Sequence, residues 1–562
     1  MPSNSETKAW HGMDRRLLLA IGLALIGHWP FVAAARYRLS YDAYVHMFFA
    51  DHYRLNWWAL WEPRWYTGFT VVSYPPLVHQ LIAALASLMG LEVAWAVALL
   101  CVLVALPTGV YAFARVFVSR RAAGYAAIAS AIMPSIYLSA YTFGQLPTLA
   151  GLLAALWELA ALARYLQSGR SLEGALAIAL MAVVAAAHHG TLLLLPWGVA
   201  AVAANKALQG RVVMRQWLVR LAIFSLASIA AVLVVIWPFW QWGLGQTMQT
   251  PIDHLSRHNF LLDPSASVMF FWPVYGPLVL LVPWAVRVAI RRKRAALGAL
   301  FAVMFVLGLG GTTPLPRWLF GEQWAWLTYD RFALWASVAL LPLAGLAALV
   351  VQRSLRRWGD RPWLIARGIA LITIGASSVA AVMVPTIRPT QPKPLDMQPI
   401  VAFLAQGDHL QWRYLTFGFG DQMARLSFLT DATTMDGSYH TARQLPELRT
   451  SGIGQIDAAY WSPLGVDGLD PILDRVSERG VRWGFVNLSA YIPVLARHGW
   501  RYVSTLTDGV EVWENPSAVL MQDDPPPTVG GQWASISWGT LPLTALIAAG
   551  ALALQAARQR NG

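Results

Sequence analysis

The sequence has 562 residues, 57% of them hydrophobic and only 13% charged, and its formal net charge is +13. Soluble domains carry charge on roughly a quarter of their residues, so this composition excludes a chain that is soluble over most of its length. Basic side chains stand mainly between apolar runs, whereas residues 390–530 hold 10 Lys and Arg against 16 Asp and Glu. This distribution follows the positive-inside rule and argues against a nucleic-acid partner.

The apolar runs predict about twelve transmembrane helices, with both termini on the cytoplasmic side of the plasma or inner membrane. The first run, residues 17–35, follows Arg15 and Arg16. We interpret it as an uncleaved span, and a cleaved signal peptide is the alternative. The other predicted spans cover residues 92–117, 122–140, 145–165, 172–187, 191–206, 217–238, 266–289, 296–311, 332–352, 364–385 and 535–557.

Two segments between the spans are predicted to lie outside the membrane. Residues 36–90 form a long first external loop, and its apolar but short part, 76–89, is predicted as an interfacial helix. Residues 390–530 contain strand-like runs and an Asp508-Gly509 hairpin signal. We therefore predict an all-α polytopic membrane protein with a small external α/β domain before the last helix. The predicted units are a membrane domain (1–389), the external domain (390–530) and a C-terminal helix (531–562).

The first external loop carries the residues that are best suited to chemistry. If residues 40–54 form a helix, Asp42 and His46 share one face at i and i+4. A carboxylate beside an imidazole near the membrane surface suits a general base that deprotonates a hydroxyl. The alternative is an interfacial helix with a solvated polar face, which the spacing alone does not exclude.

Other polar and aromatic groups are predicted to meet at the same outer side. Gln145, His188 and His189 lie in outer turns between spans, where polar groups often mark a pocket. A run from Trp61 to His79 adds aromatics with Arg and Pro, which could clamp a head group or a sugar, or could be an aromatic belt. No close spacing of metal ligands is present, so no metal site is predicted.

Several short motifs connect these positions with a known superfamily. They are Asp42 with His46, Arg64-Trp65 with Gly68, Tyr74-Pro75-Pro76-Leu77, Phe143-Gly144-Gln145-Leu146-Pro147, His188-His189, Tyr329-Asp330-Arg331-Phe332 and Val512-Trp513-Glu514-Asn515-Pro516. With them the chain resembles the GT-C glycosyltransferases, which are polytopic enzymes that use polyprenyl-phosphate-linked sugars. More narrowly, it resembles bacterial membrane proteins labelled "6-pyruvoyl-tetrahydropterin synthase-related", although nothing here resembles a soluble pterin synthase.

The resemblance implies transfer of a hexosyl or pentosyl group to a glycan, lipid or protein acceptor at the outer membrane face. Asp42 would be the catalytic base, and a cationic side chain would stabilise the departing phosphate, with Arg54, Arg64 and Arg331 as candidates. No cofactor is implied beyond the lipid-linked sugar donor. Because Asp42 has no adjacent acidic partner, a divalent metal is not supported. The implied substrate-binding residues are His46, Arg54, Arg64, Trp65, Tyr74, His79, Gln145, His188, His189, Asp330 and Arg331.

Two further functions stay open at this stage. A transporter or flippase for a lipid-linked glycan would bring charged residues and broken helices to the middle of the membrane. A noncatalytic assembly protein for a cell-envelope glycan would use residues 390–530 as its working part. The polar residues of this chain are predicted at one membrane face, which favours an enzyme over a transporter.

Overall fold

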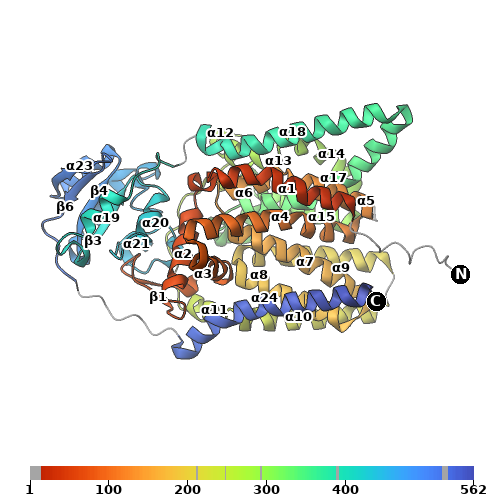
Figure 1. Cartoon of the computed structure of the whole chain (residues 1–562), viewed down its shortest axis with the longest axis horizontal. Helices are drawn as coiled ribbons and strands as arrows, with labels where there is room; N and C mark the ends of the chain where they lie inside the picture. Colours follow the sequence, from red (N-terminus) through yellow and green to blue (C-terminus); the bar gives the residue numbers. More distant parts are fainter. Residues whose placement is uncertain are drawn as a thin grey trace.

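The computed structural model describes residues 14–210, 213–246, 248–290, 294–387, 391–521 and 530–561. Long helices run side by side along the long axis of the molecule, and a small sheet lies beyond one end of them (Figure 1). We call this end the sheet end. The helices of the bundle are α1 (Arg15–Ala33), α4 (Leu91–Phe117), α5 (Arg120–Ala131), α6 (Pro134–Tyr141), α7 (Leu146–Ser168), α8 (Ser171–Ala187), α9 (His189–Gln209), α10 (Met214–Val235), α11 (Trp237–Leu244), α12 (Pro264–Phe270), α13 (Trp272–Tyr275), α14 (Val282–Ala289), α15 (Ala295–Gly308), α16 (Leu315–Phe320), α17 (Asp330–Leu355), α18 (Asp360–Ile387) and α24 (Gly531–Asn561).

The bundle has the composition of a multi-pass membrane protein. Within the described residues, ten helical segments are long and apolar enough to cross a membrane, and α8 and α15 are shorter apolar helices. Together these cover all twelve predicted spans. Helices α7 and α17 are largely buried, whereas only 17–28% of the residues in the apolar windows of α10, α18 and α24 are buried. Exposed apolar surface of this extent requires lipid around it, because water would disfavour it.

The predicted first external loop is an ordered layer between α1 and α4. It contains α2 (Ala43–Leu55), β1 (Trp61–Glu62), β2 (Phe69–Thr70) and α3 (Leu77–Met89). The predicted helix 76–89 thus corresponds to α3. Helix α2 is almost completely buried, because it packs against α3 and against α20 (Gln422–Ser427). Helix α20 belongs to residues 391–521, which we call the sheet-end segment. The predicted loop is therefore part of the protein interior at the sheet end.

Residues 391–521 form the small mixed sheet and its helices. The strands are β3 (Arg413–Phe417), β4 (Val481–Val486), β5 (Arg501–Thr505) and β6 (Glu511–Glu514), in the order β3-β4-β6-β5. Strands β3 and β4 are parallel, and the other pairs are antiparallel. The predicted hairpin joins β5 to β6, with Gly509 at φ +88° as such a turn requires. Around the sheet lie α19 (Gln398–Leu404), α20 (Gln422–Ser427), α21 (Pro446–Thr450), α22 (Asp470–Leu473) and α23 (Ile492–Arg497).

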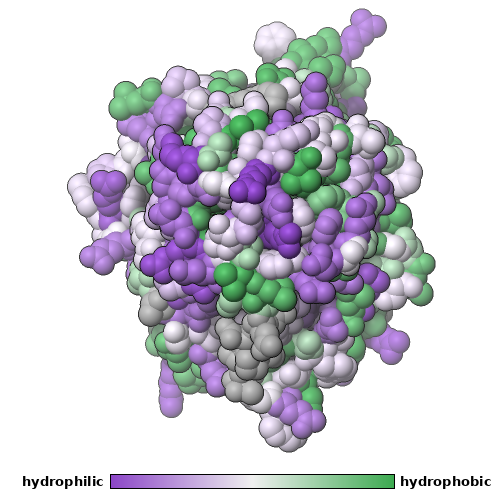
Figure 2. All heavy atoms as spheres, turned by 90° about the vertical axis from the view of Figure 1, so that its left-hand side faces the viewer, coloured by the Kyte–Doolittle hydropathy of each residue, from purple (hydrophilic) through white to green (hydrophobic). Residues whose placement is uncertain are grey.

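The surface of the sheet end differs from the sides of the bundle. Figure 2 views the molecule from this end and shows mostly hydrophilic and intermediate residues, with scattered apolar patches. A polar surface here and apolar helix faces along the sides are what a protein with this end in water and its bundle in lipid requires. The predicted fold, a polytopic helical protein with a small mixed sheet before the last helix, is confirmed.

Candidate active site

The helix ends at the sheet end bring several predicted residues together. Asp42 precedes α2, Tyr74 precedes α3, and Gln145 precedes α7. His188 lies between α8 and α9, and Asp330 and Arg331 begin α17. We call Asp42, Tyr74, Gln145, His188, Asp330 and Arg331 the Asp42 cluster. They meet because each one stands where a helix begins or ends at the same end of the bundle.

Asp42 stands at the N-terminus of α2 with its carboxylate uncommitted. Its backbone N–H donates to the carbonyl of Phe143 at 3.1 Å. Its side chain does not cap the helix, and no described residue forms a hydrogen bond or ion pair with it. Burial raises the pKa of Asp42 to about 7, an effect that Asp330 increases and Arg331 opposes. A carboxylate with this pKa can accept a proton near neutral pH.

A glycine lets the turn before α7 approach Asp42 closely. Gly144 has φ +71°, and a Cβ at this position would overlap the side chain of Ser40 and the backbone nitrogen of Ala43. The turn can therefore lie against the start of α2 only with glycine in this place. The close contact with α2 is the physical reason for Gly144 in the Phe143–Pro147 motif. The turn that Gly144 allows positions Gln145.

Arg331 is the cation of the cluster. Its Nη1 donates to the hydroxyl of Thr328, while its buried Nε has no hydrogen-bond partner among the described residues. It forms no ion pair with a described residue, although its charge acts on Asp42 and Tyr74. A Cβ on Gly190 would lie 3.1 Å from Cδ of Arg331, so the N-terminus of α9 leaves just enough room for this side chain. A guanidinium without a carboxylate partner is a ready binding group for an anion.

Asp330, next to it, is connected to the turn before α7. Its Oδ2 accepts a hydrogen bond from Nε2 of Gln145 at 3.2 Å, and its buried Oδ1 has no partner among the described residues. The two adjacent residues at the start of α17 therefore present opposite charges to Asp42.

His188 is held as a neutral ring. The backbone N–H of Thr191 donates to Nδ1 of His188 at 3.0 Å, so Nδ1 is the acceptor and Nε2 carries the proton. Nε2 then donates to the hydroxyl of Thr148 at 3.3 Å. Burial and the charge of Arg331 both lower the pKa of His188, which agrees with a neutral imidazole. His188 thus caps α9 and lines the cluster as an uncharged group.

Tyr74 forms the aromatic centre of the cluster. Its ring lies 5.5 Å from that of His46 and 5.3 Å from that of His189, measured between centroids. The sequence predicts Asp42 and His46 on one helix face. In the structure Nδ1 of His46 lies 3.1 Å from Nε2 of His79, so the ring of His46 pairs with His79. The ring of Tyr439, from the sheet-end segment, covers Tyr74 at 5.3 Å.

Asp421 is a member of the site that sequence reasoning did not find. Its Oδ2 accepts a hydrogen bond from the backbone N–H of Tyr44 at 3.0 Å, and its buried Oδ1 has no partner among the described residues. Burial and the charge of Asp42 both raise the pKa of Asp421. No signal in the sequence indicated this contact, since 377 positions separate the two residues.

Arg64 and Trp65 lie in a separate buried network, which the exposed Arg54 joins from outside. The three guanidinium nitrogens of Arg64 bond to Glu62, to Asp51 at 2.7 Å and to a backbone carbonyl. Arg54 also bonds to Asp51, at 2.6 Å. The indole of Trp65 donates to Ser427 of α20 at 2.8 Å. These contacts fasten the first loop to the sheet-end segment, which leaves Arg331 as the cation beside Asp42. Among the described residues, no three His, Cys, Asp or Glu side chains gather as metal ligands would.

Two solved structures are similar in fold to this chain, whose fold is GT-C-like. The chain is similar to mycobacterial arabinofuranosyltransferase AftD, with 17% identity and a TM-score of 0.53 over 91% of this chain and 42% of AftD. It is also similar to ArnT from Cupriavidus metallidurans, solved with undecaprenyl phosphate, with 13% identity and a TM-score of 0.51 over 90% of this chain and 99% of ArnT. The chain thus spans less than half the length of AftD but nearly all of ArnT.

Comparisons by sequence give the family. No curated protein matches the chain. Residues 14–436, which include the whole Asp42 cluster and Asp421, match a family of unknown function (DUF6541). This is more than half of the sequence, and the chain belongs to the DUF6541 family.

Proposed function

We propose that this protein is a membrane glycosyltransferase that moves a sugar from a polyprenyl-phosphate-linked donor to an acceptor hydroxyl. The observation that carries the proposal is the meeting of an uncommitted carboxylate, Asp42, with an unpaired guanidinium, Arg331, at one end of a GT-C-like bundle. A base and an anion-binding cation are the two groups that this reaction needs from the protein.

The proposed reaction uses the two charges in one step. Asp42 accepts the proton of the acceptor hydroxyl as its oxygen attacks the anomeric carbon of the donor. The bond from that carbon to the phosphate oxygen breaks, and its electrons leave with the polyprenyl phosphate. Arg331 then binds the departing phosphate and neutralises its added charge. His46, Tyr74, His79, Gln145, His188, His189 and Asp330 are proposed to line the substrate site.

Two further observations support this function. ArnT, which shares the fold over most of its length, was solved with undecaprenyl phosphate, and this bundle exposes apolar helix faces on which a polyprenyl chain could lie. We also propose a narrower likeness to the "6-pyruvoyl-tetrahydropterin synthase-related" proteins. We propose that the sheet end lies outside the cell membrane, and that the chain is divided into a membrane domain (1–389), an external domain (390–530) and a C-terminal helix (531–562).

The test uses the purified full chain in detergent with a panel of polyprenyl-phosphate sugars and a mixture of envelope glycans as acceptors. Donor loss is followed in wild type, in Asp42→Asn and in the control Asp360→Asn, whose carboxylate is exposed at the start of α18. We expect wild type and Asp360→Asn to consume one donor and Asp42→Asn to fail, with all three equally folded. Consumption by Asp42→Asn at the wild-type rate would refute the role of Asp42. No consumption of any donor by folded wild type would refute transfer and favour an assembly or transport role.

A further inference from the structure

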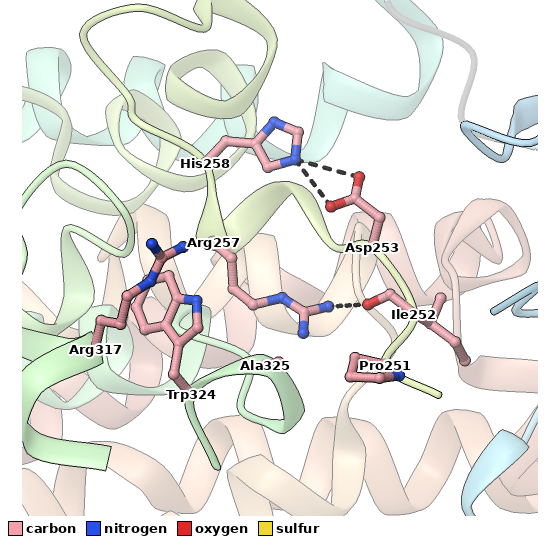
Figure 3. Close-up of a pocket in the computed structure, with 8 residues that line it drawn as sticks. All are labelled: Pro251, Ile252, Asp253, Arg257, His258, Arg317, Trp324 and Ala325. Atoms are coloured by element: carbon pink, nitrogen blue, oxygen red, sulfur yellow. Dashed lines mark hydrogen bonds and ion pairs between the residues drawn. The ribbon is translucent and has the colours of Figure 1, made fainter. Parts of the chain in front are cut away.

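A second site lies at the sheet end, beside the Asp42 cluster but outside it. It is a pocket of about 360 Å³, a size found among small-ligand sites. Figure 3 shows its lining, which includes no member of the Asp42 cluster: Pro251, Ile252, Asp253, Arg257, His258, Arg317, Trp324 and Ala325. The residues come from the loop before α12 and from the segment between α15 and α17.

Two glycines allow these segments to form the pocket together. Asn259 pairs with Gly310 in an isolated antiparallel bridge. A Cβ on Gly310 would overlap the carbonyl oxygen of Ser256, and one on Gly311 would overlap that of Arg257. The backbones can approach this closely only without side chains at the two positions. The two glycines therefore fix the close approach of the two segments that line the pocket.

Two arginine side chains line the pocket. The guanidinium of Arg257 extends across it and donates through Nη2 to the carbonyl of Ile252 (Figure 3). Arg317 lies over the ring of Trp324 at 5.6 Å. No carboxylate among the described residues lies within ion-pair distance of either arginine, although Asp253 is close enough for its charge to act on Arg257.

The one acidic side chain in the lining, Asp253, bonds to His258, and its charge also acts on Arg257. The carboxylate of Asp253 bonds to Nε2 of His258 at 3.2 Å, and Nδ1 of the same ring bonds to Asp263 at 2.8 Å. The lining therefore holds two guanidinium groups against one carboxylate. Arginine forks match the oxygens of a phosphate in geometry as well as in charge.

Exposed apolar side chains around the pocket indicate which kind of molecule would carry a phosphate bound there. Leu261 and Leu262, in the loop between the pocket and α12, are 83% and 80% exposed. Trp318, which follows Arg317 in α16, is 75% exposed. Exposed leucine and tryptophan next to arginine are typical of the membrane interface, where acyl chains and head groups meet. Helix α12 begins a membrane-spanning segment at the same place.

We propose that this pocket binds the head-group phosphate of an anionic phospholipid, with the exposed apolar side chains in contact with its acyl chains. Arg257 and Arg317 would hold the phosphate oxygens. The proposal does not depend on the transferase activity, because it is tested by binding alone.

The experiment measures lipid binding to the full chain. Purified protein in a neutral detergent is titrated with dioleoyl phosphatidylglycerol, and bound lipid is counted by native mass spectrometry. The variants are Arg257→Gln, Arg317→Gln and the double substitution. The control is Arg353→Gln, which removes an exposed arginine from the other end of α17. We expect each single substitution to weaken binding by about tenfold, as the loss of a charged hydrogen bond does, and the control to bind as wild type does.

Three results would overturn the proposal. Equal lipid binding by wild type and the double variant would refute the phosphate site. Equal retention of zwitterionic phosphatidylcholine would refute recognition of an anionic lipid. Competition by sn-glycerol 3-phosphate at the same concentration as the lipid would show a site for a soluble phosphate and refute the lipid source. If Arg257→Gln does not fold, the exposed Arg317 still allows the same comparison.

Discussion

Asp421 caps the N-terminus of helix α2, although Asp42 occupies the position of the capping residue. Asp42 occupies the capping position, where an aspartate normally accepts a backbone N–H of the first turn. Here that N–H, from Tyr44, is taken by Asp421 at 3.0 Å, and the carboxylate of Asp42 stays uncommitted. The sheet-end segment thereby satisfies the helix and leaves the predicted base available for chemistry.

Removal of this cap should reduce both stability and activity. In Asp421→Ala the N–H of Tyr44 loses its partner, and Asp42 becomes the nearest replacement. We expect a loss of about 1 kcal/mol in the free energy of unfolding and a larger relative loss in turnover. Asp421→Asn keeps an acceptor oxygen and should retain most of the stability. Thermal unfolding and donor consumption, measured on the same samples, separate the two effects. Unchanged turnover in Asp421→Ala would contradict this account of Asp42.

The pH–rate profile of the proposed reaction should fall on its acidic side (the acidic limb) because Asp42 becomes protonated. The base must be ionised, so kcat/KM should fall as pH drops through the pKa of about 7. The charge of Asp330 raises this pKa, so Asp330→Asn should move the limb to lower pH. The amide of the substituted residue can still accept the hydrogen bond from Gln145. A pH–rate profile of both proteins checks the direction, and a limb that moves to higher pH would contradict it.

Arg331 should matter to the reaction more than to the fold. Its guanidinium forms no ion pair with a carboxylate of the described residues, so the substitution Arg331→Gln leaves no buried counter-charge behind. We therefore expect Arg331→Gln to unfold close to the wild-type temperature. We expect kcat to fall by about 100-fold or more, as it does when one group that stabilises transition-state charge is lost. Single-turnover measurements with saturating donor test this. A variant that keeps kcat and changes only KM would show that Arg331 binds substrate without assisting departure of the phosphate.

Arg64 should show the opposite pattern. In Arg64→Met two buried carboxylates, Asp51 and Glu62, lose their main counter-charge. Breaking a buried ion pair from one side costs about 3–5 kcal/mol. We expect a marked drop in the unfolding temperature, and any loss of activity should track the unfolded fraction. Wild-type stability in this variant would disprove the structural role of the network.

The substitution Gly190→Ala tests the position of the neighbouring side chains with no change of charge. A Cβ there would lie 2.8 Å from Cε1 of His188 and 3.1 Å from Cδ of Arg331, so both side chains must shift. Displacement of this kind can lower turnover by up to about 100-fold. The matched control is Gly22→Ala in α1, where a Cβ would meet nothing within 4 Å. Equal activity of the two variants would show that the position of Arg331 is not critical.

The sequence predicted those features that depend on local pattern. All twelve spans correspond to helices, because an apolar run of sufficient length specifies a membrane helix with little help from the rest of the chain. The hairpin at Asp508-Gly509 was predictable because its turn chemistry is contained in two residues. Asp42, Tyr74, His188 and Arg331 could be placed at one end, since topology brings alternate helix ends together.

The sequence did not predict which side chains contact one another. Nothing in the spacing distinguishes Arg64, which is enclosed by carboxylates, from Arg331, which has none. The capping of α2 by Asp421 depends on how the sheet-end segment docks, and that is a property of the whole fold. The helical reading of the first loop placed Asp42 and His46 as partners, whereas packing against α3 pairs His46 with His79.

The last helix imposes an order on how the protein is made. In α24, Trp538 donates its indole N–H to Tyr53 of α2 at 2.8 Å and accepts a hydrogen bond from Gln80 of α3 at 2.9 Å. During synthesis α2 and α3 leave the ribosome long before α24. The polar atoms of Tyr53 and Gln80 therefore gain these two partners only when α24 has been made. A nascent chain that stops before α24 lacks both contacts to the first loop, so a helix distant in sequence completes the packing beside the site.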